Sequence, residues 1–283
     1  RDNLFATPVR TNSQQCMDRA LRSLAGQFQG SSMSAMQSDS SLPALRLWPI
    51  LAAIGIFVSV MAVDGICSLV AIRSMGQATF ATTPWKILYF AHTGMLVGSL
   101  VWIAFLSRGH FRQFGFKAPA NSRYVRVALL FGVGIGIVMT IADYWHNLVV
   151  KAPPEHFQLS LSNVVGLLSF EGLYAGTVEE ILFRGLLVTF LLRRMSGRVR
   201  VGRFDLHVAG LIVAVLFCLA HLGSFWTESV AAAAAQQAYA FIWALIYAYW
   251  YERSGSLLPS IVGHNLGNLL EDVFAFLMAW RWS

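Results

Sequence analysis

Long apolar runs separated by short basic loops constrain this chain more than any other feature. Several runs reach the roughly 20 residues needed to cross a hydrocarbon core about 30 Å thick, and each holds few charged residues. The composition is 56% hydrophobic and 12% charged, and the mean hydropathy is +0.58. A soluble domain carries about 25% charged residues. We therefore predict an integral membrane protein that crosses the bilayer several times.

The apolar runs predict an all-α fold of about seven transmembrane helices. A segment in lipid must satisfy its own backbone hydrogen bonds, and the chain lacks the alternating pattern of a barrel. The expected helices cover residues 47–71, 86–106, 126–147, 163–192, 207–222, 230–251 and 257–280. Residues 46–283 are expected to form the transmembrane helical domain, with its chemical core at 163–283.

The first 45 residues have a different composition from the rest. They are rich in Ser, Gln and small residues and lack apolar periodicity, so we predict a disordered cytoplasmic tail over residues 1–45. Met33 precedes the first apolar run, and we hypothesise that the native protein starts there. Cys16, Cys67 and Cys218 are isolated from one another, which indicates neither a disulfide framework nor a thiolate metal site.

The positive charges predict the orientation in the membrane. Loops 107–125 and 193–206 carry nine Lys and Arg residues, whereas loop 223–229 carries none. Positive loops remain in the cytoplasm, so we expect the N-terminus inside and the C-terminus outside, in a bacterial inner membrane. The net charge of +7 lies in these loops rather than along one polar face, which argues against a nucleic-acid partner.

The third apolar run contains glycines at alternate positions, Gly132, Gly134 and Gly136. A nucleotide-binding loop would need a preceding strand, and none is expected here. We therefore predict that these glycines allow close helix packing.

Ionisable side chains at membrane depth cost roughly 2.5 to 3.5 kcal/mol each, so each needs a partner or a function. Three clusters stand out, each in a different expected helix. The fourth contains Glu179, Glu180 and Arg184, the fifth contains Phe217 and His221, and the seventh contains His264, Asn265 and Asn268. At about 1.5 Å per residue, the depths of these groups fall in one layer of the membrane.

Helical spacing predicts what these groups do. Glu180 and Arg184 lie four residues apart and should pair, which leaves Glu179 on another face as a candidate general base. His264 and Asn268 are also four apart, so both can point at one oxyanion. His221 is expected to position or deprotonate water beside Glu179. A lone His or Asn is more often a hydrogen-bond partner between helices, but the joint pattern favours a functional site.

Other polar residues in the expected helices carry less weight. We expect most of them to lie near the membrane interfaces or to pair internally, with a supporting role for Glu271 as the alternative. They are Asp64, Asp143, His146, Glu171, Glu271 and Asp272. Phe217 is expected to pack, backing a catalytic residue.

The three motifs, in order, are Glu179-Glu180-x-x-x-Arg184, Phe217-x-x-x-His221 and His264-x-x-x-Asn268. Together they are similar to those of the CAAX protease and bacteriocin-processing family, also called CPBP or Abi. The resemblance covers about residues 163–283 and implies a glutamic-type intramembrane endopeptidase. It implies that Glu179 and His221 activate water, that His264 and Asn268 bind the oxyanion, and that Glu180 and Arg184 hold the fourth helix.

Several alternatives remain open from the sequence. The glutamate mechanism needs no cofactor, but Glu179, His221 and His264 could instead form a zinc site with an open position. The expected reaction is hydrolysis of a membrane-associated or lipid-modified peptide in a cavity open to the cytoplasm. A prenylated CAAX peptide, a bacteriocin or pheromone precursor and a sorting-signal protein all fit. A proton-coupled transporter and a non-catalytic immunity or scaffold protein are the competing hypotheses.

Overall fold

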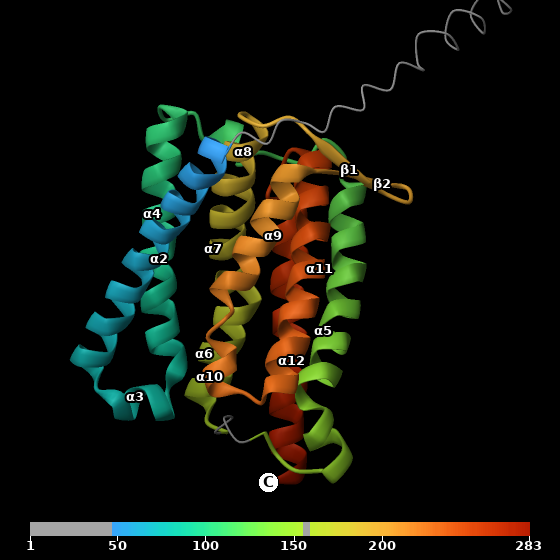
Figure 1. The fold of residues 1–283 in the computed structure, drawn as a ribbon. Coiled ribbons are helices and arrows are strands. Elements are labelled where there is room, and N and C mark those ends of the chain that lie inside the picture. The colour runs from blue at the N-terminus through green and yellow to red at the C-terminus, as the bar shows by residue number, and fades with distance from the viewer. Residues whose placement is uncertain (1–46, 155–158) are drawn as a thin grey trace, which may run out of the picture. The chain divides into compact units, whose positions relative to one another are not determined.

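The computed structural model describes residues 47–154 and 159–283, and the predicted tail 1–45 lies outside them. Figure 1 shows long helices packed side by side. The first part contains α2 (Leu47–Met75), α3 (Gln77–Thr82), α4 (Pro84–Ser107), the 3₁₀ turn η1 (Phe111–Phe114) and α5 (Arg123–Val150). The second part contains α6 (Leu161–Ser169), η2 (Phe170–Ala175), α7 (Gly176–Glu180), η3 (Ile181–Val188), α8 (Thr189–Leu192), β1 (Arg198–Val201), β2 (Phe204–His207), α9 (Val208–Ala220), α10 (Ser224–Thr227), α11 (Val230–Ser254) and α12 (Leu258–Trp282).

The expected helices are present, and the all-α membrane fold is confirmed. Five helical segments of the described chain are long and apolar enough to cross a membrane: Leu47–Met75, Pro84–Ser107, Arg123–Val150, Val208–Thr227 and Val230–Ser254. The other two expected segments, 163–192 and 257–280, are also helical but are not among these five. These are the two segments that hold most of the candidate site residues.

The helical stretch from 161 to 192 is not a uniform α-helix. Its segments η2 and η3 are π-helical, with α7 between them. A π turn closes its hydrogen bond over five residues rather than four, and such turns are frequent at functional sites. Glu179 and Glu180 therefore lie on one short α-helical turn with a widened turn on each side.

One end of the bundle is tied together by hydrogen bonds between its loops. Ala120 donates its backbone N–H to the Ser254 carbonyl, and Arg193 Nη2 donates to the Gln113 carbonyl at 3.0 Å. We call this the basic end; it comprises residues 108–122, 193–207 and 255–257. The expected loop 193–206 is partly a β-hairpin, because β1 and β2 pair antiparallel around Gly202, whose φ is 58°.

The opposite end carries the connections 76–83 and 221–229, residues 151–154 and 159–160, and the C-terminus, and we call it the C-terminal end. Within the described residues, Asn163 Nδ2 donates to the Thr82 carbonyl at 2.8 Å, which ties the first turn of α6 to the end of α3. Ser229 Oγ accepts from the Ala232 N–H and starts α11. The helices therefore run between two chemically different ends.

Glycines allow α5 and α12 to pack closely. A Cβ at Gly136 would lie 2.6 Å from Leu270 Cβ and 2.9 Å from the Gly267 carbonyl oxygen, and a Cβ at Gly132 would lie 2.9 Å from the Gly263 oxygen. The predicted packing role is confirmed for these two glycines. A Cβ at Gly134 would have nothing within 4 Å, so the prediction is wrong there.

This difference gives a matched test of the α5–α12 contact. Gly136→Ala should lower the stability of the purified protein by about 1 to 3 kcal/mol, because the new methyl overpacks a backbone contact. Gly134→Ala should leave it unchanged or slightly raise it. Thermal unfolding in detergent measures both. Equal melting temperatures for the two variants would contradict the packing account.

Candidate active site

A fully buried ion pair lies at the centre of the site. Arg184 Nη1 lies 3.0 Å from Glu180 Oε1, and both side chains are 0% exposed. The same Glu180 oxygen lies 2.9 Å from His264 Nδ1 of α12. Arg184 Nη2 also donates to the Ala244 carbonyl of α11 at 3.2 Å, and its guanidinium lies 5.0 Å from the Phe217 ring centre. Three separate helices are therefore joined through two charged side chains.

Glu179 lies beside this pair and faces two histidines. Its Oε1 lies 3.5 Å from His92 Nε2 of α4, and its Oε2 lies 3.8 Å from His264 Nε2. The Glu179 side chain is 14% exposed, whereas Glu180 is sealed. Adjacent glutamates thus occupy different environments, as expected for side chains about 100° apart on a helix.

The hydrogen bonds of His221 define its tautomer. His221 Nδ1 lies 2.9 Å from the Phe217 carbonyl oxygen, which can only accept, so Nδ1 carries the proton. The neutral ring then presents an unprotonated Nε2. Gln237 Nε2 donates to the His221 carbonyl at 3.0 Å and links the end of α9 to α11. Phe217 packs against the His221 ring at 4.6 Å between ring centres.

The polar residues of α12 are held by the 161–192 helical stretch. Asn268 Nδ2 donates to Glu171 Oε2 at 2.9 Å, and Asn265 Nδ2 donates to Thr177 Oγ1 at 3.0 Å. A Cβ at Gly176 would meet Asn265 Oδ1 and lie 2.8 Å from His264 Cγ. Glycine at this position lets α7 approach the histidine closely enough for Glu180 to reach it.

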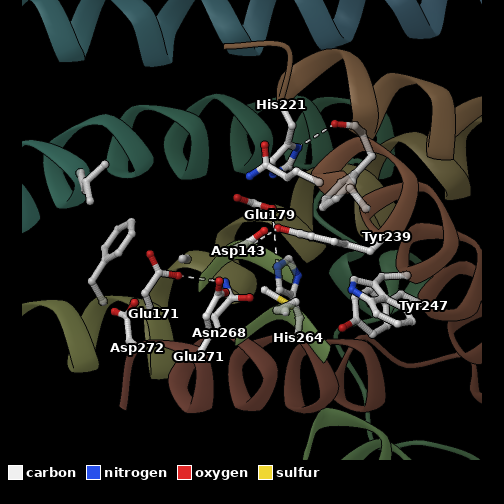
Figure 2. A pocket seen from close by; sticks show the side chains of 18 of the residues that line it. Asp143, Glu171, Glu179, His221, Tyr239, Tyr247, His264, Asn268, Glu271 and Asp272 are labelled. Atoms are coloured by element: carbon white, nitrogen blue, oxygen red, sulfur yellow. Dashed lines mark hydrogen bonds and ion pairs between the residues drawn. The ribbon is translucent and has the colours of Figure 1, made fainter. Parts of the chain in front are cut away.

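These side chains line a cavity of about 310 Å³, which we call the inner cavity. Glu179, His221, His264 and Asn268 all border it, and Figure 2 shows them together with Glu171. Residues from all three sequence motifs therefore border one cavity. His92 also borders it.

A second hollow of about 500 Å³, which we call the outer cavity, adjoins the first. The two share four lining residues: Asp143, Tyr144, Gln236 and Glu271. α5 departs from helical geometry at Tyr144, where φ is −111° and ψ is 21°, so the helix is kinked at this shared wall. Tyr239 donates its hydroxyl proton to Asp143 Oδ2 at 2.7 Å beside it.

The outer cavity leads toward the C-terminal end of the bundle. It is bordered by the last turn of α5, by Pro154 and by Glu228, Ser229 and Ala232 at the start of α11. The sequence predicted basic cytoplasmic loops together with a cavity open to the cytoplasm. In this fold the outer cavity is lined by residues at the end of the bundle opposite the basic loops, and the side from which it is reached stays a prediction.

The zinc alternative was expected to use Glu179, His221 and His264. Within residues 47–154 and 159–283, no group of three His, Cys, Asp or Glu side chains is arranged to hold a metal ion. The residues as placed do not fit the ion, and we derive no step through one.

Two residues of the site were missed or given little weight in the sequence. His92 lies in the interior of the second expected helix, and its place at membrane depth was the available signal. Glu171 was given little weight, as one of the residues expected to lie near an interface or to pair internally, and it accepts the bond from Asn268. The additional bond from Glu180 to His264 was not anticipated, because sequence spacing shows only the partner within the same helix.

The fold and the cavity define a class: a multi-pass helical membrane protein with a carboxylate–imidazole centre inside its bundle. Residues 161–270 match the family model described as Type II CAAX prenyl endopeptidase Rce1-like. This segment is an Rce1-like domain, and the resemblance to the CAAX protease family is thereby confirmed. The family match indicates an intramembrane endopeptidase, a hydrolase. No curated protein and no solved structure matches the chain.

The buried pair gives a test of what holds the site together. Arg184→Met should destabilise the protein by about 3 to 5 kcal/mol, because it leaves Glu180 charged without its guanidinium partner. The double variant Glu180→Gln/Arg184→Met should recover part of that loss. Unfolding in detergent measures both against Arg281→Met, an exposed arginine at the end of α12. A single variant as stable as this control would contradict the role of the pair.

Proposed function

We propose that this protein hydrolyses a peptide bond in a membrane-associated or lipid-modified peptide, with water activated by Glu179 and His221. The observation that carries the proposal is the placement of a partly accessible carboxylate, His221, His264 and Asn268 around one cavity inside the bundle. The Rce1-like domain match supports the same reaction class. The lipid bilayer and a peptide or protein substrate are the partners that this function requires.

In the proposed first step, a water molecule sits between the Glu179 carboxylate and the free Nε2 of His221. Glu179 takes one proton while the water oxygen attacks the scissile carbonyl carbon, which gives a tetrahedral intermediate. The carbonyl oxygen becomes the oxyanion. Glu179 then passes its proton to the leaving nitrogen as the carbon–nitrogen bond breaks, so one water is consumed and two chain ends form.

The proposed oxyanion donors are His264 and Asn268, and the contacts of His264 make its role specific. If Nδ1–H donates to Glu180, Nε2 can donate only when the ring is an imidazolium. Carboxylates near both ring nitrogens favour that charged form, at 2.9 Å from Nδ1 and 3.8 Å from Nε2. Glu180 and Arg184 thus support His264 as well as the helix. Asn268 retains a second N–H beside the one given to Glu171.

The proposal is tested by changing the base. Glu179→Gln should lower the cleavage rate by at least about 100-fold, because the amide cannot accept the proton from water. His221→Ala should also lose cleavage. The substrates are the membrane peptides that accumulate uncleaved in cells lacking the gene, identified by mass spectrometry and then presented to purified protein in proteoliposomes.

Glu252→Gln is the matched control, since this carboxylate lies in the last turn of α11 and pairs with Arg198 of β1 at 2.5 Å. It should cleave at the wild-type rate. Full activity in Glu179→Gln would rule out the mechanism. A metal chelator should leave cleavage unchanged, whereas the zinc alternative predicts its loss. In the same vesicles, a hydrolase should give no flux under a pH gradient, unlike a proton-coupled transporter.

His92 is proposed as a positioning residue that holds the Glu179 carboxylate from the side opposite His264. His92→Ala should reduce kcat about 10-fold with little change in KM, because the carboxylate loses orientation but substrate contacts remain. His92→Gln, which keeps an N–H donor, should restore part of the rate. His110→Gln, an exposed histidine at the basic end, is the control. A His92→Ala change confined to KM would contradict this assignment.

A further inference from the structure

Glu171 is a carboxylate of the inner cavity that has no part in the proposed activation of water. It lies in η2, one of the two π-helical segments, and borders the cavity together with Glu179. Its Oε2 accepts from Asn268 Nδ2 at 2.9 Å, and Figure 2 shows this bond between the two side chains. An ionisable group at membrane depth needs a partner or a function. Here the partner is itself a proposed oxyanion donor.

Two glycines bring α12 close enough for this bond. A Cβ at Gly172 would lie 2.9 Å from Leu269 Cδ1, and one turn further along the stretch a Cβ at Gly176 would lie 2.8 Å from His264 Cγ. Neither contact leaves room for a side chain, so the two helices are packed closely over two consecutive turns. Glu171 directly precedes the first of these glycines and is therefore held beside a fixed position of α12.

Each proposed oxyanion donor bonds to a carboxylate of the 161–192 helical stretch. His264 Nδ1 lies 2.9 Å from Glu180 Oε1. Asn268, one turn further along α12, donates to Glu171 Oε2. Both donors border the inner cavity. Glu171 therefore has the same relation to Asn268 as Glu180 has to His264, although only Glu180 belongs to one of the three sequence motifs.

A carboxylate partner decides which way the Asn268 amide points. An ionised carboxylate only accepts hydrogen bonds, so it holds the amide nitrogen and not the amide oxygen on its side. One N–H of that nitrogen is used in the bond, and the second is left for the oxyanion. An amide that was free to turn over would present its oxygen to the developing negative charge and repel it. A donor that is oriented beforehand needs no reorganisation during the reaction.

We propose that Glu171 is a positioning residue of the oxyanion site, which holds the Asn268 amide so that its second N–H faces the tetrahedral intermediate. Glu171 touches no reacting atom in this scheme and exchanges no proton. The inference rests on the proposed function for the reaction and adds a residue of η2 to its machinery. The competing account is a bond that only joins two helices. That account predicts a loss of stability rather than a specific loss of turnover.

The test is a double-variant cycle on the cleavage rate. Glu171→Gln keeps the size of the side chain but can also donate, so it permits either orientation of the Asn268 amide, whereas Glu171→Met removes the acceptor. Each is combined with Asn268→Ala, and kcat and KM are measured in proteoliposomes with the membrane peptides that accumulate in cells lacking the gene. Asp272→Asn is the matched control, because it removes a carboxylate that borders the same cavity and leaves both partners of the bond unchanged.

Glu171→Gln should lower kcat about 10-fold and Glu171→Met about 100-fold, with KM changed less than about threefold, because one oxyanion donor loses its orientation. In the Asn268→Ala background, neither change should lower the remaining rate more than about twofold, since the amide to be positioned is absent. Asp272→Asn should stay within about threefold of the wild-type kcat. Additive losses in the cycle, a change confined to KM, a wild-type rate for Glu171→Met or an equal loss in Asp272→Asn would overturn the proposal.

Thermal unfolding in detergent separates positioning from folding. Glu171→Gln should melt close to the wild-type temperature, and it carries the test if Glu171→Met does not fold. A loss of turnover that only follows a loss of folded protein would overturn the proposal. Full activity in Glu179→Gln would contradict the proposed function, whatever the cycle shows. An inactive Glu179→Gln together with additive effects of the Glu171 and Asn268 changes would contradict this inference alone.

Discussion

The contact between Glu180, Arg184 and His264 is the constraint on which the rest of the site depends. A carboxylate and a guanidinium that are both 0% exposed cannot be tolerated separately inside the bundle. Their partners come from α11 and α12, through the Ala244 carbonyl and the His264 ring. The pair therefore specifies how these helices are placed against the 161–192 stretch. Only with this placement does the neighbouring Glu179 face a cavity.

The two adjacent glutamates of α7 have different surroundings. Glu180 is sealed by partners that fix its charge, and Glu179 remains 14% exposed between His92 and His264. Gly176 makes this separation possible, because its missing Cβ lets α12 approach the turn. The matched family segment, residues 161–270, includes all of these residues except His92. The amino-terminal helices thus contribute to the site as well as enclosing it.

The sequence allowed the spans and the motif residues to be predicted, because both have local signals. Apolar runs report membrane depth, and a four-residue spacing places Glu180 beside Arg184. The contact between His92 and Glu179 has no such signal, since it depends on how α4 packs against α7. The bond from Glu180 to His264 joins residues 84 positions apart. The roles of individual catalytic residues remain predictions.

Other differences have physical reasons of their own. In the β1–β2 hairpin, β1 consists of alternating Arg and Val residues and the turn contains Gly202. This alternation is a strand signal, but the sequence analysis used these arginines only as a sign of positive charge. Gly134 stands in the same string as Gly132 and Gly136 but points away from α12, as one helix face cannot hold three alternate positions. The position of the cavities has no local sequence signal, because it depends on how the helices pack in the assembled bundle.

The π-helical segments η2 and η3 have a consequence for how this helix tolerates change in length. Each contains a wider turn, equivalent to one residue more than an α-helix needs. Removing a residue there would convert the turn to α-helix while keeping the flanking faces aligned. Removing one from α11 would instead rotate every later side chain by about 100°. Single-residue deletions should therefore be tolerated better in η2 and η3, the two segments that flank α7, than in α11.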